Sequence, residues 1–144
     1  STDNRYHEEN IVSHNNRVIK SMAVEKARDI FTYQGKAQVI GIDEAQFFDD
    51  EIVPIAKEPA LHGKRVIIAG LEKDYRGDTF GPMSDLLIDA EYITKVLAIC
   101  VQCGNPANYS QRLSTESGQV LVGESDKYEA RCRECFQPPV EEKE

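Results

Sequence analysis

Apolar positions along the first hundred residues gather into short runs that alternate with longer amphipathic stretches. Short continuous apolar runs are typical of buried strands, whereas apolar residues spaced three and four apart are typical of helices. The pattern predicts strands over 18–24, 39–42, 65–70 and 96–99, and helices over 25–33, 49–61 and 83–92.

This alternation of strand and helix predicts an α/β fold with a parallel sheet and right-handed crossovers. Pro54 and Pro59 lie inside the predicted helix over 49–61, so we expect that helix to be kinked or broken. Past Ile99 the helical periodicity ends, and Gly, Ser, Asn and Gln become more frequent. We therefore expect two units, an α/β core over 1–99 and a smaller, loop-rich unit over 100–144.

Composition and charge restrict the class of protein. The 144 residues are 40% apolar, which suffices for one core with a small appendage. A net charge of −8 opposes binding to nucleic acid, whose phosphates attract Lys and Arg. No apolar run approaches the roughly 18 residues that span a bilayer, and no signal-peptide pattern occurs. We expect a cytoplasmic protein that binds neither membrane nor nucleic acid.

All four cysteines occur in two CxxC pairs, Cys100 with Cys103 and Cys132 with Cys135. This spacing lets both thiolates of a pair reach one tetrahedral Zn²⁺ at about 2.3 Å. Two disulfides or a redox-active CxxC are the alternatives, but a reducing compartment favours a metal site. Four thiolates close the coordination sphere, so the pattern predicts a structural Zn²⁺ rather than a catalytic one.

Two adjacent carboxylates, Asp43 and Glu44, directly follow the predicted strand over 39–42. Ligands of open α/β sheets bind beyond the carboxyl ends of the strands. At such a place an aspartate can hold Mg²⁺ on a nucleotide, and a glutamate can accept a proton from a hydroxyl group. The alternative is a helix N-terminus at which acidic side chains only favour the macrodipole.

The next predicted strand also ends in a polar, glycine-containing segment, 71–81. Two strand ends at the same edge of a sheet form one crevice. We expect Asp43 and Glu44 at the polar end of this crevice. Its expected apolar walls are Phe48, Leu71, Tyr75 and Phe80.

Nine motifs occur in an order that resembles the zinc-containing, tetrameric thymidine kinases of bacteria and animals, and the resemblance extends over about residues 3–136. The motifs are DNRY at 3–6, VSHN at 12–15, IDEAQFF at 42–48, RVIIAGL at 65–71, FG at 80–81, CVQCG at 100–104, QRL at 111–113, VG at 122–123 and YEARCREC at 128–135. The resemblance implies a P-loop-kinase-like parallel core followed by a small zinc-stapled lasso domain. It also implies a homotetramer that transfers the γ-phosphate of ATP to the 5′-hydroxyl of thymidine.

Site residues follow from the same resemblance. Glu44 would be the general base, and Asp43 would support the Mg²⁺ that accompanies ATP. Further contacts with the nucleotide would come from Asp3, Asn4, Arg5, Ala45 and Gln46. Contacts with thymidine would come from Phe48, Leu71, Tyr75, Phe80, Ser110, Tyr128 and the lasso residues Gln119, Val120, Leu121, Val122 and Gly123.

The family pattern also includes a phosphate-binding loop of the G-x-x-x-x-G-K-[ST] type before the DNRY motif, and these 144 residues contain none. The chain as written is therefore expected to be inactive as a kinase, because no such loop cradles the β- and γ-phosphates. We interpret it as a thymidine kinase sequence from which the N-terminal segment is missing. The alternative is a catalytically inactive, zinc-stabilised nucleoside-binding module.

Overall fold

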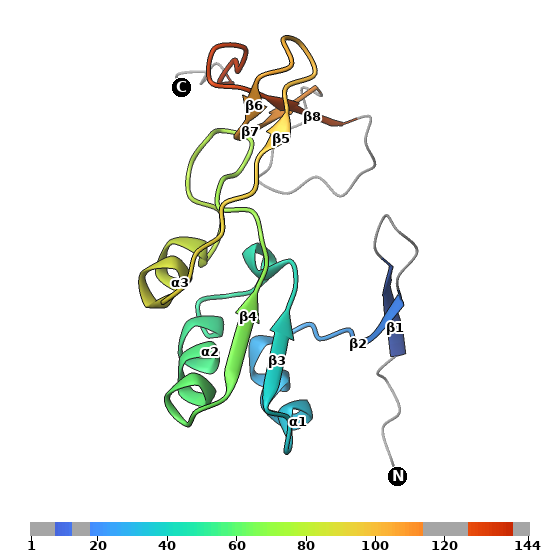
Figure 1. Cartoon of the computed structure of the whole chain (residues 1–144), viewed down its shortest axis with the longest axis vertical. Coiled ribbons are helices and arrows are strands. Elements are labelled where there is room, and N and C mark those ends of the chain that lie inside the picture. The colour runs from blue at the N-terminus through green and yellow to red at the C-terminus, as the bar shows by residue number, and fades with distance from the viewer. Residues whose placement is uncertain (1–7, 13–17, 114–126, 140–144) are drawn as a thin grey trace, which may run out of the picture.

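The computed structural model describes residues 8–12, 18–113 and 127–139. Figure 1 shows an α/β unit built around β3 and β4, a second unit that contains β5 to β8, and a hairpin of β1 and β2 beside them. The elements are β1 (Glu8–Val12), β2 (Val18–Met22), the 3₁₀ helix η1 (Ala27–Asp29), α1 (Ile30–Gln34), β3 (Val39–Ile42), the 3₁₀ helix η2 (Ala45–Phe47), α2 (Ile52–Leu61), β4 (Arg65–Ile68), α3 (Met83–Asp89), β5 (Ala98–Ile99), β6 (Pro106–Ala107), β7 (Tyr109–Arg112) and β8 (Tyr128–Arg131).

Strands β3 and β4 pair in parallel, and α2 forms the crossover between them. Because successive side chains of a strand point to opposite faces, each strand presents one set of residues to the helices. Ile40 and Ile42 are buried in the core, whereas Val39 is 56% exposed and Ile67 is 54% exposed on the other face. The buried core consists of Ala27, Ile40, Ile42, Ala45, Ile52, Ile55, Ala56, Met83 and Leu86. The predicted parallel sheet is confirmed for this pair of strands.

Two other predicted strands form, but outside the parallel sheet. β2 pairs antiparallel with β1, and β5 pairs antiparallel with β6. The expectation that 18–24 and 96–99 would extend the parallel sheet is therefore wrong among the described residues. An apolar run indicates that a strand can form, whereas its pairing depends on the hydrophobic pattern of the partner and on turn geometry.

The helices agree with prediction in place and differ in extent. The segment over 25–33 forms η1 and the short α1, and the segment over 83–92 stops at Asp89. Of the two expected outcomes for α2, the break does not occur, since one helix covers Ile52–Leu61 with Pro59 inside it, and the kink stays a prediction. Pro54 falls in the first turn, where the N–H group has no partner within the helix.

The second unit contains only strands and turns among its described residues. β7 pairs antiparallel with β8, and Cys100, Ala107 and Cys132 form a small buried cluster of their own. Just beyond β7, the N–H of Leu113 donates to the carbonyl of Lys127 at 2.9 Å. The division between 1–99 and 100–144 remains a prediction.

Within the described ranges, none of the helices is long and apolar enough to cross a membrane.

Candidate functional site

Asp43 and Glu44 lie where β3 ends, and the backbone there makes an unusual turn. Glu44 has φ +53° and ψ 40°, the left-handed conformation that residues with a side chain rarely adopt. The Oδ1 atom of Asp43 accepts a hydrogen bond from the N–H of Glu44 at 2.9 Å. Backbone strain of this kind gathers at functional sites, because the surrounding structure must hold it in place.

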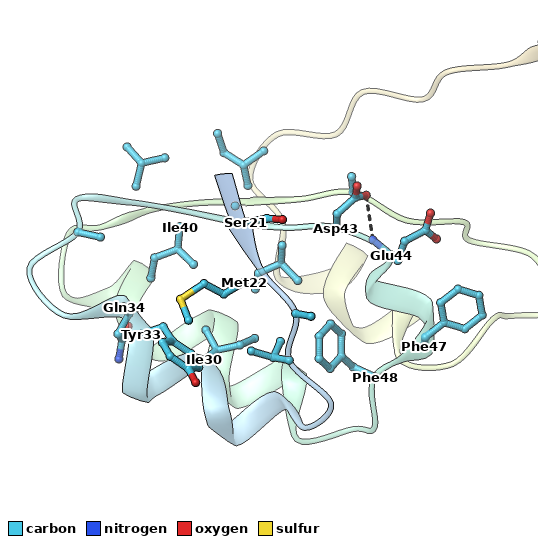
Figure 2. Close-up of a pocket in the computed structure, with 18 of the residues that line it drawn as sticks. Ser21, Met22, Ile30, Tyr33, Gln34, Ile40, Asp43, Glu44, Phe47 and Phe48 are labelled. Atoms are coloured by element: carbon cyan, nitrogen blue, oxygen red, sulfur yellow. Dashed lines mark hydrogen bonds between the residues drawn. The ribbon is translucent and has the colours of Figure 1, made fainter. Parts of the chain in front are cut away.

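Both carboxylates are exposed and line a cavity of about 900 Å³. Figure 2 shows Asp43 and Glu44 at one end of this cavity, beside Phe47 and Phe48. The rest of the wall comes from β2, α1, β3 and the end of β4, with Met22, Ile30, Tyr33, Gln34 and Ile40 among its side chains. A cavity of this size that joins carboxylates to aromatic rings is suited to a nucleoside or nucleotide.

The ends of β3 and β4 are joined by main-chain hydrogen bonds and by one side chain. The N–H of Ala45 donates to the carbonyl of Ala69 at 3.0 Å. Gln46, which is only 3% exposed, accepts a hydrogen bond from the N–H of Leu71 at 3.0 Å and donates one to the Glu44 carboxylate. These hydrogen bonds therefore tie the two strand ends together.

Gly81 makes this close approach possible. Its φ is +50°, and a Cβ atom there would lie 2.3 Å from the carbonyl oxygen of Gln46. We expect Gly81→Ala to lower the free energy of unfolding in urea by about 1–3 kcal/mol more than the matched change Gly63→Ala. Gly63 has φ +81° but no atom near its Cβ position, so it isolates the cost of the backbone conformation. Equal losses in the two variants would contradict the clash.

The segment between β4 and α3 is a compact loop organised by Asp74. This buried carboxylate accepts hydrogen bonds through Oδ1 from the N–H groups of Arg76 and Asp78, at 2.8 and 3.1 Å. Lys73 and Thr79 form an isolated antiparallel bridge across the loop. At its end Phe80 is buried and packs edge-to-face on Phe47, with ring centroids 5.5 Å apart.

The same loop contacts the second unit through stacked side chains. The guanidinium carbon of Arg112 lies 3.5 Å from the ring centroid of Tyr75. Arg112 is buried and also donates to the hydroxyl of Tyr128 at 2.8 Å. Because Arg112 and Tyr128 are opposite each other on β7 and β8, the strands that lead to Cys132 also hold the ring of Tyr75.

The four cysteines form one cluster, as their spacing predicts. Their Sγ atoms all lie within 4.8 Å of one another, and none forms a disulfide. Cys103 and Cys132, one from each pair, have their Sγ atoms 3.5 Å apart. Tetrahedral Zn²⁺ with Zn–S bonds of about 2.3 Å separates its sulfur ligands by roughly 3.8 Å, so this arrangement fits the ion.

The thiols of the cluster differ in how readily they lose a proton, because the pKa of Cys100 is lowered and that of Cys135 is raised. Burial opposes the thiolate of Cys100, yet hydrogen bonds from the N–H groups of Cys132 and Cys103 lower the pKa of Cys100 to about 6. The neighbouring thiols of Cys132 and Cys103, together with burial, raise the pKa of Cys135 to about 12. Four adjacent thiolates therefore need a cation among them, which is the behaviour expected of a metal site.

Comparison with known proteins decides the family. A family model described as thymidine kinase matches residues 1–136. The chain belongs to the thymidine kinase family. It is 50% identical to a thymidine kinase of Rhodothermus sp. over 137 residues, which are 95% of this chain and 64% of the relative. It is 46% identical to a thymidine kinase of Bacteroides thetaiotaomicron over 134 residues, 93% of this chain and 67% of the relative.

A thymidine kinase of Bacteroides fragilis is 44% identical over 140 residues, 97% of this chain and 70% of the relative. The chain thus spans about two thirds of the length of the relatives that it matches.

The structure gathers part of the site expected for a thymidine kinase. Asp43, Glu44 and Phe48 line one cavity together with Phe47. Phe80 packs on Phe47 from outside the cavity wall. The described residues of the cavity wall do not include Ala45, Gln46, Leu71, Tyr75, Phe80, Ser110 or Tyr128. Ser110 lies on β7 opposite Ala130. Asp3, Asn4, Arg5, Gln119, Val120, Leu121, Val122 and Gly123 lie outside the described residues.

Two contributors to the site were not expected from the sequence. Asp74 organises the loop, and Arg112 stacks on Tyr75. Only Asp74 has a local signal, since an aspartate two and four residues before two N–H groups is a frequent turn former. The position of Arg112 depends on β7 pairing with β8, which no short pattern specifies.

Proposed function

We propose that the protein containing this chain is a thymidine kinase that transfers the γ-phosphate of ATP to the 5′-hydroxyl of thymidine. The observation that carries the proposal is the Asp43–Glu44 pair at the carboxyl end of β3, in a cavity of about 900 Å³, within a chain of the thymidine kinase family. Phosphoryl transfer asks a protein mainly to position its reactants and to stabilise charge.

Glu44 is the proposed general base. Its exposed carboxylate can accept the 5′-hydroxyl proton as that oxygen attacks the γ-phosphate. Asp43 is the proposed ligand for the Mg²⁺ bound to ATP, a role suited to a carboxylate beside a nucleotide. The ion, when bound, would neutralise charge on the β- and γ-phosphates. Asp3, Asn4, Arg5, Ala45 and Gln46 remain proposed contributors to nucleotide binding.

Thymidine is proposed to bind between the aromatic side chains and the loop that follows β4. Phe47 and Phe48 supply flat apolar surface next to Glu44, which suits a pyrimidine ring, and buried Phe80 supports the ring of Phe47 edge-to-face. Leu71, Tyr75, Ser110 and Tyr128, together with the backbone of the lasso segment 119–123, are the proposed remaining contacts. Closing that segment over the site would exclude water from the phosphoryl group.

The cysteine cluster is proposed to bind a structural Zn²⁺. Cys100, Cys103, Cys132 and Cys135 supply four sulfur donors, so no coordination position is left for a substrate. Free thiols in such pairs also support the expected cytoplasmic location, where disulfides are rare.

Assembly into a homotetramer is proposed from an exposed apolar strip that begins in α3 and continues after it. Ile88, Tyr92, Ile93 and Val96 are each at least 60% exposed, more than a monomer usually leaves uncovered in one segment. Light scattering on the eluting protein should give a mass of four subunits. A monomer at micromolar concentration would contradict this proposal.

A radiometric assay with ATP and Mg²⁺ tests the function directly. The protein containing this chain should phosphorylate thymidine, with deoxycytidine and deoxyadenosine as comparison substrates. Thymidine that binds saturably in calorimetry but gives no product would instead support the catalytically inactive nucleoside-binding module.

A further inference from the structure

Gln46 hydrogen-bonds to both strand ends of the site. Its Nε2 donates to Oε2 of Glu44, and its Oε1 accepts from the N–H of Leu71. A carboxylate can only accept and a backbone N–H can only donate, so the two partners fix which way the amide points. At 3% exposure the amide is screened from water, which strengthens both bonds.

Gln46 is held in this place by its surroundings. A Cβ atom at Gly70 would lie 2.7 Å from its Oε1, and one at Gly81 would lie 2.3 Å from its carbonyl oxygen. Two glycines therefore leave the space that Gln46 occupies. Its backbone belongs to η2, which begins directly after the left-handed Glu44. The amide is thus a rigid support beside a strained residue.

Glu44, in contrast, has an exposed side chain with several rotatable bonds. Without a partner its carboxylate would sample many directions, and a general base is effective only within hydrogen-bond reach of the proton that it accepts. The bond to Gln46 restrains Oε2 of Glu44, and Glu44 lines the cavity. The bond to Leu71 fixes the same amide relative to the loop over 70–81.

We propose that Gln46 is a positioning residue for phosphoryl transfer. It orients the Glu44 carboxylate and fixes its position relative to the loop that begins at Leu71. This inference rests on the proposed function. It gives Gln46 a task other than the ATP contact expected from the sequence, and its burial favours this task.

Gln46→Glu is the sharpest variant, because it keeps the shape and an acceptor for Leu71 but removes the donor to Glu44. We expect kcat for thymidine to fall about 10–100-fold, the effect of losing a hydrogen bond to a charged group. KM for thymidine should change less than about 3-fold, since ground-state contacts with the nucleoside are retained. Gln38→Glu, at an exposed position before β3, is the matched control and should retain the wild-type kcat.

A double-mutant cycle separates positioning from a structural role. If Gln46 acts through Glu44, Gln46→Glu should lower kcat little further in a Glu44→Gln background. If the role of Gln46 were only structural, the fold-losses of kcat in the two single variants would multiply in the double variant. Gln46→Met, which buries no charge, is the second variant should Gln46→Glu fail to fold, and we expect it to give a similar loss of kcat.

The outcomes distinguish this inference from the proposed function. A wild-type protein that phosphorylates thymidine, with Gln46→Glu or Gln46→Met retaining its kcat, overturns the positioning role alone. Independent, multiplying losses in the cycle also overturn it. A wild-type protein that phosphorylates no nucleoside overturns the proposed function and this inference with it.

Discussion

Glu44→Gln should lower kcat for thymidine phosphorylation by about 10²–10⁴-fold, the usual contribution of a positioned general base. The substitution removes the proton acceptor and changes little else, because the new amide oxygen can still accept the hydrogen bond from Gln46. KM for thymidine should stay within a few-fold of the wild-type value. Steady-state kinetics with saturating ATP and Mg²⁺ measure both constants.

Glu91→Gln is the matched control for that experiment. Glu91 is exposed after α3, outside the cavity wall, so the change removes the same charge without touching the site. Its kcat should equal that of the wild type. A Glu44→Gln protein that keeps most of its kcat would show that another group accepts the proton.

Cys132→Ser should release the metal and weaken thymidine binding, while the α/β unit stays folded. Cys132 directly follows β8 and belongs to the small buried cluster, and β8 holds Arg112 through Tyr128. Loss of the metal-bound turn at Cys132–Cys135 therefore frees the guanidinium of Arg112, whose carbon lies 3.5 Å from the ring centroid of Tyr75. We expect KM for thymidine to rise by roughly 10–100-fold, the range in which mutations around metal sites lower metal affinity or activity. A chelator that strips the metal should have the same effect on the wild type.

Elemental analysis and circular dichroism measure this outcome alongside the kinetics. Glu134→Gln lies between the two cysteines of the same knuckle and is exposed, so it tests whether any change in this turn is harmful. It should keep one Zn²⁺ per subunit and a normal KM. A Cys132→Ser protein with unchanged zinc content and KM would contradict both the ligand assignment and the route through Arg112.

The central strands could be predicted because their apolar runs are continuous and bounded by polar turns. Ile40 and Ile42 are buried in one such run, and the run containing Val66 and Ile68 pairs with it in parallel. The partners of 18–24 and 96–99 could not be predicted, since an apolar strand accepts any edge of suitable register. The proline pair did not break α2: Pro54 falls in the first turn, which tolerates proline, and the helix continues through Pro59.

The candidate site likewise contains residues that could be predicted from the sequence and contacts that could not. Cys100, Cys103, Cys132 and Cys135 were predictable, because ligand spacing within a knuckle is a local property of the chain. Asp43 and Glu44 were predictable from their place after a buried run. The contact of Arg112 with Tyr75 joins residues 37 positions apart on a loop and a strand, and only tertiary structure brings them together.

The hydrogen bond between Leu113 and Lys127 holds together the two ends of the stretch 114–126, so that this stretch could be exchanged for another. Its two attachment points are adjacent, and paired strands that lead back to the cysteine cluster hold them there. Closing a loop of twice the length between fixed ends costs only about 0.6 kcal/mol more. A segment of another length between the same two residues should therefore leave the folded framework intact. If residues 119–123 contact the nucleoside as proposed, such an exchange would change which nucleoside the protein prefers.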